Sequence, residues 1–554
     1  MITHDIIIVG GGLAGMRAAI ETCKTTDTAL ISKTHPLRSH SICAQGGVNA
    51  ALDWEKDPWE SHAFDTIKGS DYLADQDAVE ILCKESRDRI YELDHWGAIF
   101  DKTHEGKIAQ KYSGGASYPR CCYSGDVTGH EMMQTYFEQI LKNNIQIYVE
   151  SFVTSLLVEN GKCTGLTLID LKTGELEIIR AKAVILATGG CGRTYLRSTN
   201  SLQCTGDGMA LAYNVGAGLK DMEFIQFHPT TLFGTNILIS ETVRGVGGYL
   251  LNANNERFMA RYAPDKMELA PRDIVSRSMQ TEILEGRGID NEYFLLDMRH
   301  LDEDLIRGEF AQVYDIAKSF GGIDALKEPI PVQPAQHYTM GGIKTNIWGE
   351  TSIKGLFAAG ECACVSVHGA NRLGGNSLME AMVFGRRAGI KAVEYSAKHN
   401  LGNISKCIIK NEMHSLLNKK EGEKPSTIIN ELHTIMWNDV GIFREKNKLQ
   451  NAFIKINELK ERYKSIYIED DSRIFNTDLT NAIELGFMLE LSELITLGAV
   501  NREESRGSHY RTDFQERDDT HYLKHAIAYK NDNDIRFEYD NVTITLFEPK
   551  ERKY

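Results

Sequence analysis

The sequence lacks any run of apolar residues long enough to cross a membrane. A spanning helix needs about 20 mostly apolar residues, and no stretch of the 554-residue chain approaches that length. Residues 1–4 lead directly into the apolar run 6–9, which leaves no room for a cleavable secretion signal or a transit peptide. We therefore expect a cytoplasmic protein that reaches the inner face of the cell membrane only through partner subunits.

Excess positive charge and closely paired cysteines are also missing. The formal net charge is −15 at pH 7, which argues against a nucleic-acid binder because phosphate contacts need grouped lysines and arginines. None of the 11 cysteines stands in a C-x-x-C spacing, so the chain offers no ligand set for an iron–sulfur cluster or a structural zinc. A redox reaction here would have to pass its electrons to another molecule.

What the chain does contain is typical of a soluble globular protein. Apolar residues make up 42% and charged residues 25% of the sequence. A single core stops growing well below this chain length, so we expect about two to four domains. The length leaves ample material to bury a cofactor.

The N-terminal segment has the pattern of a dinucleotide-binding βαβ unit. An apolar strand over 5–9 is followed by Gly10-Gly11-Gly12-Leu13-Ala14-Gly15, a helix to about Cys23 and a second strand over 28–31. A G-x-G-x-x-G turn lets the backbone approach a pyrophosphate, and the helix N-terminus stabilises its charge. A tight turn without a ligand is the alternative, and the glycines alone do not separate NAD from FAD.

Later strand ends favour FAD. The second strand ends in Ser32-Lys33, where an NAD site commonly has an acidic residue for the ribose. Two further apolar strands end in Ala187-Thr188-Gly189-Gly190 and in Gly360-Glu361. Strand ends so far apart along the chain resemble those of two-part FAD-binding domains, with an insertion between the parts.

The predicted fold is α/β, with a Rossmann-like two-part FAD-binding domain and an inserted α+β capping domain. Helical spacing of Lys, Glu, Ile and Leu, as in 427–436 and 451–463, indicates a helical domain after the second part. The tail is polar with a late strand over 542–546. The predicted boundaries are 1–221 with 339–399 for FAD binding, 222–338 for the cap, 400–510 for the helices and 511–554 for the tail.

One ten-residue segment carries a specific resemblance. Arg38-Ser39-His40-Ser41-Ile42-Cys43-Ala44-Gln45-Gly46-Gly47 resembles the flavin-attachment segment of the flavoproteins of the succinate dehydrogenase and fumarate reductase family. His40 matches the histidine that bonds to the flavin 8α-methyl group; an exposed or capping histidine is the alternative. The likeness extends over nearly the whole chain, including 126–130, 205–208 and 506–509.

The resemblance implies FAD as the cofactor, attached covalently through His40. Such a bond would raise the reduction potential of the flavin, as the oxidation of succinate demands. The residues expected at FAD are Gly10, Gly11, Gly12, Leu13, Ala14, Gly15, Ser32, Lys33, Ser39, His40, Ser41, Gln45, Gly46, Gly47, Val153, Ala187, Thr188, Gly189, Asp207, Glu361, Ser377 and Leu378.

A four-carbon dicarboxylate needs fixed donors at both ends. Motif similarity assigns this role to His228, Ser240, His337 and Arg372, with Ser240 standing where threonine is common. Arginine suits a clamp because its planar fork makes two parallel bonds to one carboxylate. A structural ion pair is the alternative for Arg372, and a satisfied core histidine is the alternative for each histidine alone.

The proton path is expected at Arg272, Glu241 and Arg244. Pro271-Arg272-Asp273 resembles the motif whose arginine gives a proton to fumarate. Arginine normally stays charged, since its pKa lies above about 12, so we expect Glu241 and Arg244 to reprotonate it. In the implied reaction, hydride passes from flavin N5 to one alkene carbon while Arg272 protonates the other. A surface helix pair is the alternative for Glu241 and Arg244.

One segment departs from the family pattern. Tyr112-Ser113-Gly114-Gly115 stands where Phe-Gly-Gly is common, so an aromatic ring near the substrate is missing or comes from Tyr112. His130-Glu131 begins like a zinc-protease helix but lacks the second histidine. We expect no metal site in this chain.

Two alternatives to the implied function stay open. An L-aspartate oxidase has a similar fold and proton machinery but binds FAD without a covalent bond. A catalytically idle flavoprotein would be expected to lose Arg272 or Arg372, and both are present. The resemblance further implies an iron–sulfur subunit as partner and, through it, a membrane anchor and quinone.

Overall fold

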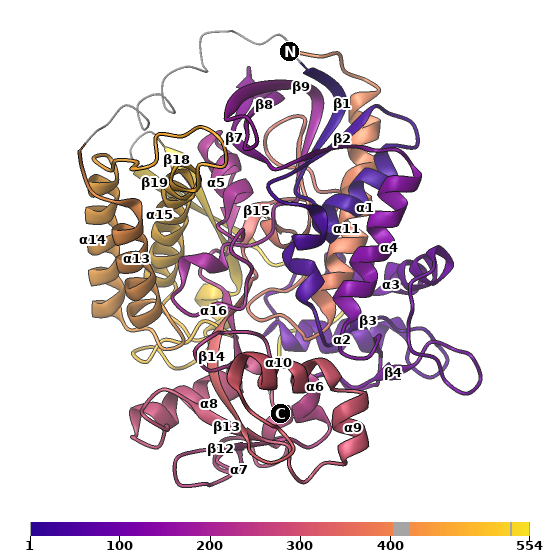
Figure 1. Cartoon of the computed structure of the whole chain (residues 1–554), viewed down its shortest axis with the longest axis vertical. Coiled ribbons are helices and arrows are strands. Elements are labelled where there is room, and N and C mark those ends of the chain that lie inside the picture. Colours follow the sequence, from indigo (N-terminus) through magenta and orange to yellow (C-terminus); the bar gives the residue numbers. More distant parts are fainter. Residues whose placement is uncertain (1, 403–420, 532–533, 553–554) are drawn as a thin grey trace.

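A computed structural model describes residues 2–402, 421–531 and 534–552 (Figure 1). Its largest sheet has seven strands in the order β6-β2-β1-β9-β8-β7, with β16 also paired to β9. The strands are β1 (Ile2–Val9), β2 (Thr28–Ser32), β6 (Gln146–Val149), β7 (Ser151–Glu159), β8 (Lys162–Asp170), β9 (Glu175–Leu186) and β16 (Leu356–Ala358). Helices join the parallel strands, so the predicted α/β fold class is confirmed.

The centre of this sheet is parallel and buried on both faces. β1 pairs in parallel with β2 and β9, and β16 joins β9 in the same direction. Ile6, Ile7 and Ile8 are fully buried, as expected for a strand that helices cover on both sides. The carboxyl ends of β1, β9 and β16 therefore meet at one edge, where ligands bind in folds of this class.

Helices α1 and α11 pack closely beside this edge (Figure 1). A Cβ atom at Gly385 would lie 2.6 Å from the carbonyl oxygen of Ala14, so glycine permits the close approach of the two backbones. The helices of this part are α1 (Leu13–Thr22), α2 (Trp59–Gly69), α3 (Gln76–Trp96), α4 (Thr128–Lys142), α5 (Asp207–Asn214) and α11 (Asn376–Ser396). A small sheet of β3 (Val48–Asn49), β4 (Gln110–Lys111) and β5 (Cys121–Cys122) lies with them.

Residues 222–338, here called the capping region, form the lower part of Figure 1 around a sheet of their own. The sheet has the order β11-β14-β13-β12. Its elements are β11 (Ile225–Leu232), α6 (Glu241–Gly245), β12 (Tyr249–Leu251), α7 (Met259–Tyr262), α8 (Arg272–Leu284), β13 (Phe294–Asp297), α9 (Glu303–Gly308), α10 (Ala311–Gly321) and β14 (Ile330–Thr339). A separate apolar core supports this sheet.

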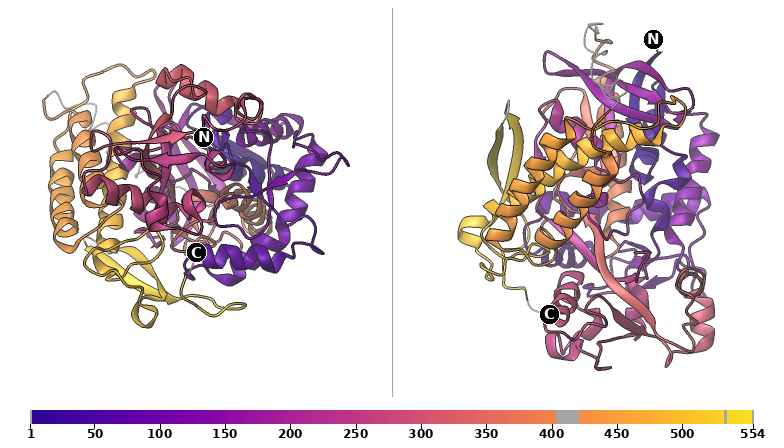
Figure 2. Two further views of the ribbon diagram at one scale, coloured as in Figure 1. Left: turned by 90° about the horizontal axis from the view of Figure 1, so that it is seen from below. Right: turned by 60° about the vertical axis from the view of Figure 1, so that its left-hand side comes forward.

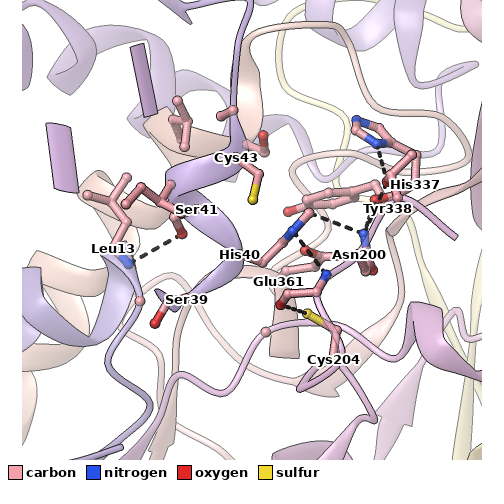
Figure 3. Close-up of a pocket in the computed structure, with 18 of the residues that line it drawn as sticks. Leu13, Ser39, His40, Ser41, Cys43, Asn200, Cys204, His337, Tyr338 and Glu361 are labelled. Atoms are coloured by element: carbon pink, nitrogen blue, oxygen red, sulfur yellow. Dashed lines mark hydrogen bonds between the residues drawn. The ribbon is translucent and has the colours of Figure 1, made fainter. Parts of the chain in front are cut away.

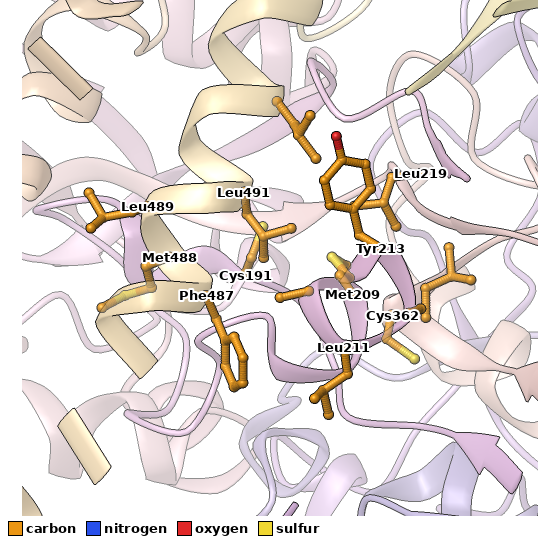
Figure 4. Close-up of a cluster of buried hydrophobic side chains, with 14 of the residues drawn as sticks. Cys191, Met209, Leu211, Tyr213, Leu219, Cys362, Phe487, Met488, Leu489 and Leu491 are labelled. Atoms are coloured by element: carbon orange, nitrogen blue, oxygen red, sulfur yellow. The ribbon is translucent and has the colours of Figure 1, made fainter. Parts of the chain in front are cut away.

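Three long helices follow residue 421 and lie side by side in Figure 2. They are α13 (Pro425–Asp439), α14 (Lys446–Tyr463) and α15 (Thr477–Asn501). The helical spacing seen over 427–436 and 451–463 correctly predicted α13 and α14. α15 packs on α5 through a buried apolar cluster that includes Leu491 and Met209 (Figure 4). One continuous core thus joins these helices to the large sheet.

The chain after residue 511 returns to the rest of the molecule as a hairpin. A five-stranded sheet has the order β17-β15-β10-β18-β19. Its strands are β10 (Leu219–Lys220), β15 (Gly342–Lys344), β17 (Ala363–Cys364), β18 (Lys524–Asn531) and β19 (Asp534–Asn541), and a short helix α16 (Asp519–Tyr522) precedes the β18–β19 hairpin. The domain boundaries stay a prediction.

The strand predicted over 542–546 is wrong, because this stretch is irregular. The sequence alternates like a strand, but its backbone finds side-chain partners instead of a neighbouring strand. Thr543 N–H donates to Asp75 at 2.8 Å, and Leu546 N–H donates to the side-chain oxygen of Gln76 at 2.7 Å. In the described part of the chain, no helix combines the length and apolar character needed to span a bilayer.

Candidate active site

A cavity of about 940 Å³ lies where the carboxyl ends of β1, β9 and β16 face the capping region. Every residue expected at the cofactor lines it except Gly15. A Cβ atom at Gly15 would lie 1.9 Å from the carbonyl oxygen of Gly10, so this glycine lets helix α1 start close to the turn. Of the expected substrate and proton-path residues, those in the cavity wall are Glu241, Arg272, His337 and Arg372.

The turn before α1 forms an anion cradle. Gly10 has φ +119°, a conformation that favours glycine, and a Cβ atom there would lie 2.1 Å from the carbonyl oxygen of Ala187. Gly12 caps α1 without a side-chain hydrogen bond, so backbone N–H groups at the helix start face the cavity edge. The Leu13 N–H lies 3.4 Å from the Ser41 hydroxyl (Figure 3). A diphosphate fits this cradle.

Two carboxylates surround Lys33, the residue that follows β2. Lys33 Nζ lies 2.7 Å from Asp207 and 2.6 Å from Glu484. Burial opposes the charge of Lys33, but the two carboxylates raise its pKa above the usual value. Glu484 comes from α15, and sequence analysis missed it because nothing local links residue 484 to residue 33. Lys33 stands where an acidic residue is common, and its charge is balanced by Asp207 and Glu484, which lie far from it in the sequence.

His40 is a neutral imidazole inside the cavity. Its Nδ1 accepts from the Ser201 N–H at 3.4 Å, and its Nε2 lies 3.2 Å from the Asn200 amide nitrogen (Figure 3). Burial, and then the Arg372 cation, lower the pKa of His40 to about 4. A neutral imidazole can use a ring nitrogen to bond with carbon. Asn200 was not predicted from the sequence.

Two histidines meet on paired strands. His228 of β11 and His337 of β14 have ring centroids 4.9 Å apart. Burial, and then the nearby Arg272 cation, hold the pKa of each far below the usual value. His337 Nδ1 lies 2.8 Å from the Thr199 hydroxyl. Both rings are therefore neutral, and His228 lies behind His337 without lining the cavity.

One glutamine oxygen binds both arginines of the site. The side-chain oxygen of Gln226 accepts from Arg272 Nη1 and from Arg372 Nη2, each at 3.1 Å. The Gln226 amide nitrogen donates to Asn371 at 2.9 Å. Gln226 is fully buried and was missed in the sequence. Its position two residues before His228 on one strand is the signal that could have identified it.

Glu241 connects the proton-path arginines. Its Oε2 lies 2.6 Å from Arg272 Nε and 3.4 Å from Arg244 Nη2. Burial would raise the pKa of Glu241, but the two guanidinium groups hold it well below the usual range. The Gly114 N–H donates to its other oxygen at 2.8 Å. The structure therefore brings the three expected residues together, with Arg244 buried behind the cavity wall.

The hydroxyl of Ser240, which was expected to contact the substrate, does not reach the cavity. Ser240 caps helix α6, and its oxygen lies 2.7 Å from the Thr242 hydroxyl. Thr242 lines the cavity and Ser240 does not. Tyr112 and Ser113 line the cavity too, and Tyr112 is 61% exposed. No residue of segment 112–115 places a buried ring beside the arginines.

Several buried polar atoms of the cavity wall have no partner among the described residues. They are Gln45 Oε1, Asn200 Oδ1, Gln203 Oε1, Gln312 Oε1 and Arg372 Nε. A buried polar atom without a partner costs about 1–3 kcal/mol, so native proteins seldom leave several together. A large polar ligand would satisfy them. Together with the anion cradle, these atoms fit FAD.

We predict that acid destabilises the protein because several histidines are buried as neutral rings. The pKa is lowered for His40, His62, His228, His337 and His509. The unfolded chain takes up protons near pH 6.5 while the folded chain does not, so the free energy of unfolding falls below that pH. His525, whose pKa is raised by Asp221 despite burial, acts in the opposite direction but is a single group.

The measurement is the melting temperature of the flavin-loaded protein between pH 7.5 and 5. We expect a progressive fall whose slope is smaller in His62→Gln, because glutamine keeps a donor toward Asn376 without a titrating ring. Each such histidine contributes up to about 1.4 kcal/mol per pH unit. Equal melting temperatures at both ends of the range would contradict the prediction.

Comparison with known proteins supports these features. The family model described as FAD binding domain matches residues 5–378, and that described as Fumarate reductase flavoprotein C-term matches residues 429–554. The succinate dehydrogenase flavoprotein subunit of Rickettsia felis is 42% identical, over 98% of this chain and 95% of its own. The fumarate reductase flavoprotein subunit of Mycobacterium tuberculosis is 42% identical, over 100% of this chain and 99% of its own.

A solved structure is similar throughout. A mutant of FrdA from E. coli quinol fumarate reductase superposes with a TM-score of 0.95 at 40% identity. The match covers 100% of this chain and 99% of that chain. The expected FAD-binding fold is thereby confirmed.

Proposed function

This chain belongs to the succinate dehydrogenase and fumarate reductase flavoprotein family, and on that premise we propose that it interconverts succinate and fumarate. The observation that carries the proposal is that the guanidinium groups of Arg272 and Arg372 both donate to the side-chain oxygen of Gln226. Both Arg272 and Arg372 line the same cavity as the residues expected at FAD. A dicarboxylate bound there meets two cations beside a redox cofactor.

The substrate is held at two ends. Burial, and then Arg272, lower the pKa of Arg372 to about 10, so the guanidinium stays charged at neutral pH. Its Nε has no partner among the described residues and is available to a carboxylate. His337, a neutral ring in the cavity wall, binds the other carboxylate without adding charge. Ser240 and His228 support this end from behind the wall.

Arg272 acts as the proton donor and acceptor. When bound, FAD exchanges a hydride with one carbon of the substrate. Arg272 gives a proton to the adjacent carbon in fumarate reduction and takes it back in succinate oxidation. Glu241 lies between Arg272 and Arg244 and passes the proton on, so that no neutral arginine persists. The surrounding cations stabilise the negative charge that develops on the substrate.

A steady-state assay of the purified flavoprotein tests the function. We expect fumarate reduction with a reduced dye, succinate oxidation with an oxidised dye, and inhibition of both by malonate. The alternative of an L-aspartate oxidase is not favoured, since the relatives are named for succinate and fumarate. Oxidation of L-aspartate without activity toward succinate would overturn the proposal.

We further propose that FAD is attached covalently through His40. The Ser201 N–H occupies Nδ1, so Nε2 would be the ring nitrogen that bonds to the 8α carbon of a bound flavin. Attachment would replace one methyl hydrogen and the imidazole proton by a carbon–nitrogen bond, releasing two protons and two electrons, and the isoalloxazine ring would take up the electrons. Low basicity suits this step, because the ring is neutral at physiological pH.

His40→Ser is expected to bind FAD without a covalent bond. In acid-treated denaturing gels, wild-type protein matured in its own host should fluoresce under ultraviolet light, whereas His40→Ser should not. The loss should affect succinate oxidation more than fumarate reduction, because an untethered flavin has a lower reduction potential. Cys43→Ser is the matched control, since this thiol also lines the cavity. Fluorescence that persists in His40→Ser and vanishes in Cys43→Ser would place the bond at Cys43.

Electrons are proposed to leave through an iron–sulfur subunit. The spacing of the cysteines offers no cluster in this chain. One relative, from Wolinella succinogenes, is named 8-methylmenaquinol:fumarate reductase flavoprotein subunit and is 41% identical. We propose a similar quinone-linked complex, held by a membrane anchor, with this chain peripheral on the inner face of the membrane. Copurification of an iron–sulfur protein with the native chain tests this arrangement.

A further inference from the structure

The carboxylate of Asp273 lies next to the proton donor in sequence, in the first turn of α8. Its side chain is 1% exposed. It accepts hydrogen bonds from Arg277 at 3.1 Å and from Asn371 at 3.2 Å, and it forms an ion pair with Arg552. None of these four residues lines the large cavity. They form a charged cluster behind the site.

Arg552 connects the capping region to helix α2. One nitrogen of its guanidinium pairs with Asp273, and Nη1 donates to the carbonyl of Gly69 at 3.3 Å. Asn371 donates to the same carbonyl at 3.3 Å and to the other oxygen of Asp273. Arg552 and Asn371 are therefore two parallel bridges between Asp273 and Gly69. The side chain of Arg552 is 8% exposed, which keeps its bridge away from water.

The same network reaches both catalytic guanidinium groups. Asn371 directly precedes Arg372, and its side-chain oxygen accepts from Gln226 at 2.9 Å. Gln226 in turn accepts from Arg272 and Arg372. A displacement of Asp273 would thus move Arg272 through the backbone and Arg372 through Asn371. The separation of the two arginines depends on the place of Asp273.

The bridge requires the shape of arginine. Two nitrogens of one planar group meet two acceptors on different segments, whereas lysine has a single nitrogen on a flexible stem. Asp273 would keep Arg277 and Asn371 if Arg552 were replaced, so the fold has other support at this point. Arg552 adds a second link from Asp273 to Gly69 beside that of Asn371, and it is the link that carries a positive charge.

We propose that Arg552 is a positioning residue for the proton donor. It holds Arg272 at a fixed position relative to Arg372, the residue that clamps the substrate carboxylate. This inference rests on the proposed interconversion of succinate and fumarate. Proton transfer is sensitive to small displacements of the donor, because the reacting atoms must meet within hydrogen-bond reach. Loss of the bridge therefore lowers kcat more than it weakens substrate binding.

The test compares Arg552→Gln with wild type as flavin-loaded protein. We expect kcat for fumarate reduction to fall by about tenfold or more, while KM for fumarate and the inhibition constant of malonate change by less than about threefold. Arg552→Lys should recover only part of kcat. Arg536→Gln is the matched control, because its exposed pair with Glu538 lies on β19 away from the site. That control should stay within about twofold of wild type.

A coupling measurement separates positioning from general destabilisation. Arg552→Gln combined with Asp273→Asn should be no slower than Asp273→Asn alone, because Arg552 acts through that carboxylate. Wild-type kcat in Arg552→Gln, or a kcat loss that only follows lost flavin, would overturn the inference. If Arg552→Gln fails to fold, Arg552→Lys decides: a lower kcat at unchanged KM supports the inference, and wild-type kcat refutes it.

The activity of the wild-type protein separates a failure of the proposed function from a failure of the role of Arg552. A wild-type protein that turns over neither succinate nor fumarate refutes the proposed function. A wild-type protein that does so, beside an equally active Arg552→Gln, refutes only the role of Arg552.

Discussion

Arg272→Ala is expected to abolish turnover in both directions, with kcat for fumarate reduction falling by about 1,000-fold or more. Arg272 lines the cavity and donates to both Glu241 and Gln226. Alanine removes the proton donor and also one of the cations that face the developing charge. The two directions share one transition state, so succinate oxidation must lose the same factor. Dye-linked assays measure both rates, and the absorption spectrum reports bound FAD.

The control for this variant is Arg261→Ala in the same capping region. Arg261 is about half exposed and pairs with Glu282 and Glu256. Its removal should change turnover by less than about twofold. If Arg272→Ala kept more than about a tenth of wild-type activity with full flavin content, general acid catalysis would have to come from another group.

Arg372→Lys is expected to raise KM for succinate by about 100-fold, and the inhibition constant of malonate by a similar factor. Lysine preserves the charge but not the planar fork. Arg372 bonds Gln226 and Ser377 through its two terminal nitrogens and leaves Nε available. The donors of lysine all sit on one nitrogen, so it cannot reproduce the spread of the three guanidinium nitrogens that reach these partners and a carboxylate from different sides. Steady-state kinetics and malonate titration of the flavin spectrum measure the loss.

Arg386→Lys provides the comparison for that substitution. Arg386 lies on α11, which follows the Arg372 loop, and its partly exposed side chain pairs with Glu21 and Glu85. We expect KM to remain within about threefold of wild type. An Arg372→Lys enzyme with unchanged KM would show that the clamp lies elsewhere.

Local sequence patterns predicted the parts of the molecule that depend on local geometry. The glycines before α1 are one example. Their spacing between an apolar strand and a helix was sufficient to predict the turn and its role as an anion cradle. The helical repeat after residue 421 is likewise a local property. The resemblance around His40 correctly indicated the family and FAD. The roles of the individual site residues stay predictions until the variants are measured.

The contacts that could not be predicted from the sequence join residues that lie far apart along the chain. Glu484 meets Lys33 across 451 residues, and Gly114 meets Glu241 across 127. Neither pair has a spacing that could have suggested it. The wrong strand over 542–546 has the same origin, because the partners of its backbone are the side chains of Asp75 and Gln76. Alternation indicates a possible strand, but only a neighbour in space completes one.

The ion pair between Lys33 and Glu484 has a consequence for biosynthesis. Lys33 lines the flavin cavity and comes from the beginning of the chain, whereas its partner Glu484 belongs to α15 near the end. A ribosome has released almost the whole polypeptide before residue 484 becomes free to fold. Until α15 has folded, Lys33 in the cavity wall lacks one of its two carboxylate partners, so we expect the fully paired wall to form only after translation.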